Sequence, residues 1–208
     1  VTGVADDNLD WTDGWRGRGQ FFVCQQYDDG FGDNGIEADN NGEDNAATPR
    51  SGPVLSNLTL IGAPGSTASD IGMLLREGTG ASIHNAIVTG WGDYCLDIDH
   101  DETFANAMTG ESLSGALIVE SSYFNCDTSF DDEEDDAFAV SEFITSMNTR
   151  NSTEDPQLTA PYDRESPDFR PASGSPAASG AMVPKDSFFQ EVDFVGGVDP
   201  QEIGRAHV

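Results

Sequence analysis

The chain has 208 residues, of which 38 are acidic and 9 are basic, so its formal net charge at pH 7 is −29. A surface this negative repels nucleic acids and anionic membranes, which excludes both as main binding partners. We therefore expect no nucleic-acid partner and no direct insertion into a membrane. With a hydrophobic fraction of 37%, the chain is long enough to form one domain with its own core.

Short apolar-alternating runs recur in pairs along the chain. The first pair is QFFVCQQ at 20–26 and GIEADN at 35–40, separated by an acidic, glycine-rich turn. None of the runs keeps apolar residues at positions i, i+3, i+4 and i+7 for long enough to predict a helix, so each is predicted to be a strand. The later runs are 57–62, 72–77, 85–90, 94–99, 115–121 and 137–143.

The spacing of these runs predicts a solenoid. Leu60 to Val88 is 28 positions, Val88 to Ile118 is 30, and both Val23 to Leu60 and Ala38 to Leu75 are 37. The shared shift of 37 predicts an insertion near 41–51. Strands at such a repeat, with apolar residues inside and acidic neighbours in water, favour an all-β, single-stranded parallel β-helix. A β-sandwich is the alternative, because short strands and turns also fit it.

Three blocks carry a family resemblance: residues 6–21 (DDNLDWTDGWRGRGQF), 35–62, and the run to 95–104 (CLDIDHDETF). They resemble the C-terminal half of secreted bacterial right-handed β-helix proteins with a pectin-lyase-like fold, often named lipoproteins. The likeness continues through 168–180 and 186–198. It implies an extracellular or cell-surface location, by secretion or a lipid anchor, and further coils before residue 1. It implies no agreed biochemical activity.

The domain boundaries follow from the same comparison. We expect β-helix coils over 1–172 and a C-terminal cap or extension over 173–202, in which Phe188, Phe189 and Phe194 cover the last coil. Residues 203–208 (IGRAHV) match the translation of a common sequencing adapter. The chain is therefore predicted to be an environmental fragment that is truncated at the N-terminal end of its solenoid.

Clusters of acidic residues are candidate calcium sites, because calcium takes six to eight oxygen ligands from flexible Asp- and Gly-rich loops. Adaptation of the surface to saline surroundings is the alternative, since salt screens the repulsion between like charges. The acidic run at 131–136 is more typical of a solvated loop than of a calcium site. The candidate ligands are Asp28, Asp29, Asp33 and Asp39 in one cluster, and Asp97, Asp99 and Asp101 in a second.

The three cysteines lie in or at the ends of predicted strands. Cys95 and Cys126 are about one coil apart, so an exported protein would allow a disulfide between adjacent coils. Cys24 is then left without a partner in this chain. Buried free thiols are the ordinary alternative for all three.

Three tryptophans are candidate carbohydrate platforms. Trp11 and Trp15 flank a turn beside two arginines, and Trp91 lies at a predicted coil corner. Tryptophan faces stack on sugar rings, and nearby charged groups bind hydroxyls or carboxylates. The alternative is that these indoles pack at corners of the β-helix.

These observations favour a non-catalytic, exported β-helix that binds carbohydrate, calcium or both, or acts as a rigid structural element. Its expected partner is a polysaccharide or a cell-envelope component, and its only expected cofactor is Ca²⁺. The alternative is a calcium-assisted polysaccharide lyase that eliminates across uronate polymers. In that case Arg16, Arg18 or Arg76 would lie near the position of the catalytic base.

Overall fold

The computed structural model describes residues 1–109, 116–145 and 150–201, and its strands form two main parallel sheets. The short sheet, in spatial order, consists of β1 (Leu9–Trp11), β3 (Ile36–Ala38), β5 (Ile71–Leu75) and β7 (Tyr94–Ile98). The long sheet consists of β2 (Arg18–Gln25), β4 (Val54–Ile61), β6 (Ala81–Thr89) and β8 (Leu117–Glu120), with β9 (Tyr123–Asn125) also paired to β6.

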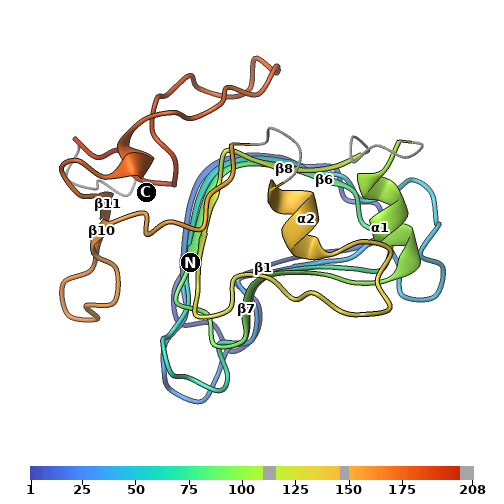
Figure 1. Cartoon of the computed structure of the whole chain (residues 1–208), viewed down its shortest axis with the longest axis horizontal. Coiled ribbons are helices and arrows are strands. Elements are labelled where there is room, and N and C mark those ends of the chain that lie inside the picture. Colours follow the sequence, from blue (N-terminus) through green and yellow to red (C-terminus); the bar gives the residue numbers. More distant parts are fainter. Residues whose placement is uncertain (110–115, 146–149, 202–208) are drawn as a thin grey trace.

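Each turn of the chain adds one strand to each sheet, and every pairing within these two sheets is parallel. Seen along the stack, the short strands form one side, and the longer strands bend around two others (Figure 1). This is a parallel β-helix, so the predicted fold class is confirmed.

The register agrees with the predicted spacing in two places and differs in two. Ala38 pairs with Leu75, and Leu60 pairs with Val88, as predicted. Val23 pairs with Thr59 instead of Leu60. Ile118 pairs with Ser82, whereas Val88 pairs with Phe124. The last difference arises because residues between β7 and β8, including helix α1 (Asp101–Ala107), lengthen that coil.

One row of residues bends the long sheet. Asn57 and Asn85 occupy the left-handed backbone region, with φ of 57° for each, and they lie at equivalent positions of neighbouring strands. The Asn85 side chain donates to Ser56 Oγ at 3.0 Å and to the Met182 carbonyl at 2.8 Å. Asparagine tolerates this backbone better than most residues because its short amide bonds locally. The row continues with Phe21 and Ser121.

Helix α2 (Val140–Thr145) corrects the prediction of a strand at 137–143. Its buried residues are Val140, Phe143 and Ile144, which have the i, i+3, i+4 spacing of an amphipathic helix. These side chains join the core of the β-helix at its last rung, where only isolated bridges continue the parallel pairing. A helix satisfies its own backbone groups, so it closes the core where no further strand follows.

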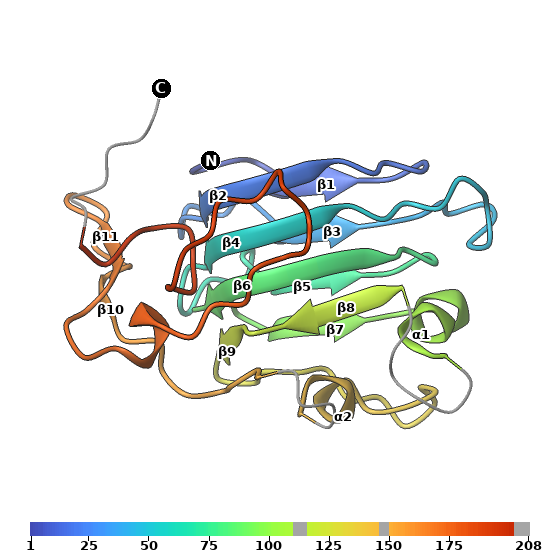
Figure 2. The ribbon, with the colours of Figure 1, turned by 90° about the horizontal axis from the view of Figure 1, so that it is seen from above.

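The C-terminal part returns along the outside of the long sheet. β10 (Leu158–Ala160) and β11 (Asp168–Pro171) pair antiparallel, and the short 3-10 helix η1 (Pro176–Ala178) follows. Residues 181–197, which we call the strap, then cross β6, β4 and β2 (Figure 2). Residues 202–208, including the predicted adapter translation, lie outside the described residues.

The prediction that three phenylalanines cover the last coil is wrong. Phe194 stacks on Phe21 of the first coil with ring centroids 6.2 Å apart, and Phe188 lies under the Arg18 guanidinium. Arg18 also pairs with Asp186 at 2.9 Å. Phe189 packs beside Phe188. The strap therefore ties the first coils together along their flank, and α2 covers the last coil instead.

A disulfide joins Cys95 of β7 to Cys126, just after β9, across 31 positions of sequence. It is the pairing that the coil spacing favoured. Cys24 is a buried free thiol. None of the helices in the described part of the chain has both the length and the apolar run needed to cross a bilayer.

We predict that Asn85→Ala lowers the free energy of unfolding by about 2–4 kcal/mol, because it removes buried hydrogen bonds and strains a left-handed position. Asn85→Gly loses the same bonds but accepts the backbone, so its loss should be smaller. Urea denaturation of both variants measures the difference. Equal losses of stability for the two variants would show that the left-handed backbone does not strain Asn85→Ala. Unchanged stability in both variants would show that the hydrogen bonds of Asn85 do not stabilise the fold.

Candidate functional site

A repeated aspartate precedes each strand of the short sheet. The sequence Asp-x-x-apolar-x-apolar occurs at 6–11, 33–38, 70–75 and 93–98. The Asp70 backbone N–H donates to the Asp33 carbonyl at 3.0 Å, and the Asp93 N–H donates to the Asp70 carbonyl at 2.9 Å. Asp6, Asp33, Asp70 and Asp93 thus form a column along the stack, which we call the acidic column. Of these four, only Asp33 was among the residues predicted as calcium ligands, although the repeated motif marks all four positions.

Three carboxylates lie close together at the end of the acidic column that begins the stack of coils. One oxygen from each of Asp6, Asp7 and Asp33 lies within 4.8 Å of the others. Asp7 Oδ1 also accepts the backbone N–H of Asn34 at 2.8 Å, which fixes its orientation. Burial raises the pKa of both Asp7 and Asp33, and the neighbouring negative charges raise it further. A carboxylate triad of this kind matches the oxygen chemistry that calcium prefers.

A second row of acidic residues lies on the outer face of the short sheet. Asp10 pairs in register with Glu37, which is followed on the next two strands by Leu74 and Asp97. Adjacent strands are about 4.8 Å apart, so consecutive carboxylates of such a row repel one another. We use the name acidic face for this row, the acidic column, and the two carboxylates that directly follow β3 and β7, Asp39 and Asp99.

Arg76 is a basic residue embedded in this face. Its Nε donates to Asp39 Oδ1 at 2.9 Å, and its Nη2 lies 2.7 Å from Glu37 Oε1. Burial lowers the pKa of Arg76, but the hydrogen bond to Asp39 and the charges of Asp39 and Glu37 raise it more. The guanidinium therefore stays protonated and clamped between two carboxylates.

Two carboxyl groups of the acidic face have strongly raised pKa values. Burial raises the pKa of Asp97 to about 7, with Asp131 and Asp99 adding repulsion. Burial also raises the pKa of Glu37 to about 7, with Asp7, Asp39 and Asp10 adding to it, despite the opposing effect of Arg76. Both groups therefore titrate near neutral pH, where a bound cation would favour their ionised forms.

The structure divides the predicted calcium ligands among different surroundings. Asp33 belongs to the triad, Asp97 and Asp99 lie on or beside the acidic face, and Asp39 is held by Arg76. The exposed Asp28 and Asp29 lie in the loop after β2, and the exposed Asp101 begins α1. The residues of the first predicted cluster are therefore not all brought together, and Asp6 and Asp7 lie beside Asp33 instead of Asp28 and Asp29.

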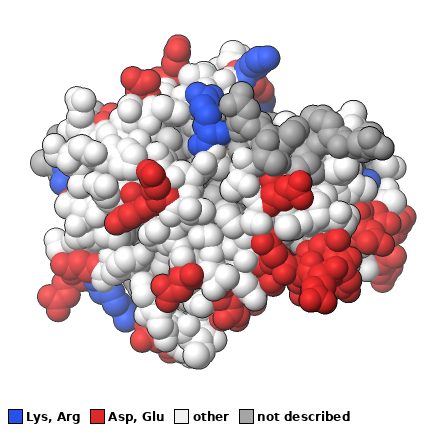
Figure 3. Space-filling view, viewed as in Figure 1, with Lys and Arg blue, Asp and Glu red and all other residues white. Residues whose placement is uncertain are grey.

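The acidic run 131–136 lies next to the acidic face. The Asp131 backbone N–H donates to the Leu96 carbonyl at 3.2 Å, so the run begins beside β7. Figure 3 shows acidic side chains gathered densely where the loop before α2 passes, with few basic side chains in view. Residues 132–135 are all exposed, which is the expected state of a solvated loop.

Two of the three candidate tryptophans are buried. Trp11 is 5% exposed and donates to Thr79 Oγ1 at 3.1 Å, and Trp91 is 3% exposed and donates to the Leu60 carbonyl at 3.3 Å. Trp15 is 45% exposed, and its ring centroid lies 5.9 Å from that of Trp11. Trp11 and Trp91 therefore pack inside the β-helix, and of these three tryptophans only Trp15 exposes its ring to solvent.

The three candidate arginines are not brought together. Arg16 donates from Nε to the Arg50 carbonyl at 2.8 Å, and Arg18 pairs with Asp186 of the strap. Both lie at the start of the long sheet in the first coil, whereas Arg76 follows β5 of the short sheet. No pair of them forms the base and charge-neutralising group that an elimination needs.

Comparison with known protein families gives one result. The family model described as "Pectate-lyase like beta helix domain" matches residues 1–162. The match ends within the loop between β10 and β11, so the strap lies beyond it. Comparisons with curated proteins and with solved structures found no match.

We predict that Asp97→Asn stabilises the protein at pH 8 in the presence of a chelator. The pKa of Asp97 is raised from 3.8 to about 7 on folding, so this group favours the folded state most below pH 4 and loses that contribution as the pH rises toward 7. The full shift corresponds to about 4 kcal/mol, which partial exposure reduces to roughly 1–2 kcal/mol.

Urea denaturation at pH 5 and pH 8 tests this prediction, with the exposed Asp135→Asn as the control for loss of one charge. The stabilising effect of Asp97→Asn should be larger at pH 8 than at pH 5. If Asp97→Asn were less stable than the wild type at pH 8, ionised Asp97 would not destabilise the folded protein and the prediction would be wrong.

Proposed function

Because the chain belongs to the pectate-lyase-like β-helix family, we propose that it is a calcium-binding β-helix module that works outside the cell as a rigid, non-catalytic element. The β-helix supplies the rigidity, since each coil is bonded to the next along both sheets. Membership in the family gives the fold, and the proposed role depends on the site, because one fold supports many functions.

The triad of Asp6, Asp7 and Asp33 is the observation that carries this proposal. Three carboxylates within 4.8 Å of one another supply three to six oxygens, and calcium takes six to eight at 2.3–2.6 Å. Backbone carbonyls and water complete such a shell in other calcium sites. Without a cation, the triad leaves three like charges together, with Asp70 adding repulsion to Asp33.

The disulfide supports an extracellular location. Disulfides persist in oxidising compartments and are rare in the cytosol. Cys95 and Cys126 lie 5.6 Å apart between Cα atoms and join neighbouring coils. Extracellular calcium modules bind with dissociation constants of about 10⁻⁴–10⁻³ M, which a partly exposed carboxylate site of this kind is suited to give.

The state of Arg76 favours a binding role over elimination. A lyase needs a base that accepts a proton from the sugar, and two carboxylates hold Arg76 in its protonated form. Release of unsaturated products from a uronate polymer with calcium present would overturn the non-catalytic part of the proposal.

Calorimetric titration with calcium tests the binding part. We expect saturable heat at micromolar to millimolar calcium and a rise in melting temperature. Asp33→Asn should weaken binding about tenfold or more, because it removes one of three clustered carboxylates. Asp135→Asn removes the same charge from the solvated run and should leave the affinity nearly unchanged.

Two outcomes would contradict the calcium proposal. One is that sodium chloride at matched ionic strength gives the same rise in melting temperature. The acidic residues would then serve only as an adaptation to salt. The other is that Asp33→Asn and Asp135→Asn weaken calcium binding equally. Calcium would then be attracted to the whole acidic surface as a counterion and would have no specific site.

A further inference from the structure

A cavity of about 330 Å³ lies beside the disulfide, at the turns that follow β4, β6 and β9. Cys126 is among the residues that line this cavity, and it is partly exposed. Cys95 is 0% exposed and lies inside the β-helix. The two cysteines of the disulfide therefore differ in access, and a small molecule in the cavity reaches Cys126 but not Cys95.

The lining of this cavity is polar and negatively charged. Asp127, which directly follows Cys126, is exposed and is the charged side chain among the described residues that line the cavity. Its negative charge attracts a cation and repels an anion that approaches Cys126. Hydroxyl and amide groups along the wall offer further hydrogen bonds; they belong to Ser66, Thr89 and Asn125.

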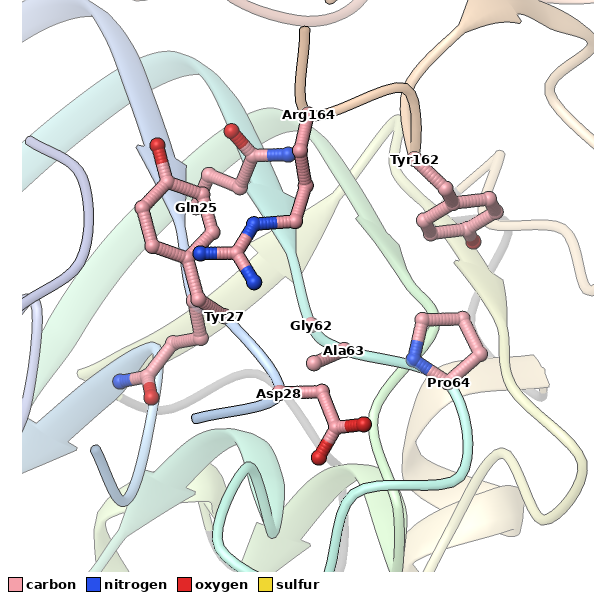
Figure 4. Close-up of a pocket in the computed structure, with 9 residues that line it drawn as sticks. Gln25, Tyr27, Asp28, Gly62, Ala63, Pro64, Tyr162 and Arg164 are labelled. Atoms are coloured by element: carbon pink, nitrogen blue, oxygen red, sulfur yellow. The ribbon is translucent and has the colours of Figure 1, made fainter. Parts of the chain in front are cut away.

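A neighbouring cavity contains a positive charge, but that charge is directed elsewhere. The two cavities share Pro64 and Tyr162, and Arg164 lines only the neighbouring one. The Arg164 guanidinium lies 4.2 Å from the centroid of the Tyr27 ring, and Figure 4 shows it there, across the space from Tyr162. Arg164 therefore does not replace the negative charge beside Cys126 with a positive one.

The chain segment that carries Cys126 is also held to β7 by backbone hydrogen bonds. The Leu96 N–H donates to the Ser129 carbonyl at 3.1 Å, and the Asp131 N–H donates to the Leu96 carbonyl at 3.2 Å. These bonds do not involve the sulfur atoms. They therefore keep Cys126 beside Cys95 when the disulfide is open, which favours its closure again.

The surroundings of Cys95 suit a neutral thiol. Its Sγ lies 3.2 Å from the Val88 carbonyl oxygen, which can accept a hydrogen bond from an S–H group. A thiolate at the same place would face that oxygen, and burial disfavours its charge. Reduced Cys95 is therefore expected to be protonated and hydrogen-bonded.

We propose that Cys126 is a site of reversible exchange with small thiols, and that the site prefers cationic thiols. The thiolate of the incoming molecule attacks Cys126 Sγ and forms a new S–S bond with it. The bond between Cys95 and Cys126 breaks, and Cys95 leaves with the electron pair as a thiolate. Cys95 then takes up the proton that the incoming thiol released. Attack of Cys95 on Cys126 reverses the step and releases the small thiol.

Peptide mapping by mass spectrometry tests which sulfur is attacked. The folded protein is incubated with cysteamine and EDTA at pH 8 and then quenched with acid. We expect the cysteamine adduct on Cys126 at least tenfold more often than on Cys95, because the attacked sulfur must be accessible. Cys24 is an internal control, because it is buried and burial raises the pKa of its thiol to about 11. It should remain unmodified.

Two single variants give a second measurement of access. Cys95→Ser leaves a thiol at Cys126, and Cys126→Ser leaves one at Cys95. Iodoacetamide should alkylate Cys126 in the first variant at least tenfold faster than Cys95 in the second, because exposed thiols react faster than buried ones. Melting curves check that both variants are folded.

The preference for a cationic thiol is tested with cysteamine and 2-mercaptoethanesulfonate, each at the same thiolate concentration and at low salt. The ratio of their exchange rates should fall about threefold or more in Asp127→Asn, because the charge beside Cys126 is removed. Asp135→Asn removes the same charge from the solvated run and should leave the ratio nearly unchanged.

Four results would overturn the proposal. They are an adduct mainly on Cys95, equal alkylation rates in the two cysteine variants, equal effects of the two aspartate variants on the rate ratio, and exchange that occurs only at urea concentrations that unfold the protein. All measurements are made with a chelator, so they are independent of the calcium proposal.

Discussion

The in-register hydrogen bonding of each coil to the next determines every other feature of this protein. Because the pairing is parallel and the register repeats, a residue in one coil lies directly over its equivalent in the next. Ile36, Met73 and Leu96 therefore form one continuous apolar line inside the β-helix. Asn57 and Asn85 stack in the same way at the bend of the long sheet. Several positions of the repeat therefore form columns of similar residues, although others, such as the row of Glu37, Leu74 and Asp97, do not.

The same stacking explains the acidic face. An aspartate at a fixed place in each repeat becomes a column of carboxylates about 4.8 Å apart, which is an unfavourable arrangement in the absence of cations. Arg76 relieves this repulsion at Glu37 and Asp39. The raised pKa of Asp97 reflects burial and the repulsion that remains. A divalent cation at the triad would extend the same relief to the opposite end of the face, so the proposed calcium site follows from the geometry of the fold.

The sequence predicts the parts of this structure that depend on local periodicity. The positions of β2 to β8, the pairing of Leu60 with Val88 and the loop near 41–51 follow from alternation and spacing, whereas β1 and β9 were not predicted and the run at 137–143 contains a helix. The pairing of Ile118 could not be predicted, because α1 and its neighbours lengthen one coil. The strap could not be predicted either, since Phe194 meets Phe21 across contacts that no local pattern encodes. The aspartate motif before each strand of the short sheet could be seen in the sequence. The burial of Trp11 and Trp91 could not be predicted, because it depends on how the chain turns at the corners of the β-helix.

The proposed calcium site depends directly on the register, because its aspartates come from neighbouring coils. A crystal structure of the protein grown with a lanthanide in place of calcium is the most direct test. The account predicts an anomalous peak among Asp6, Asp7 and Asp33, with Asp70 and Asp93 following on successive coils. A shifted register that separates these aspartates, or an ordered triad with no peak at saturating lanthanide, would contradict it.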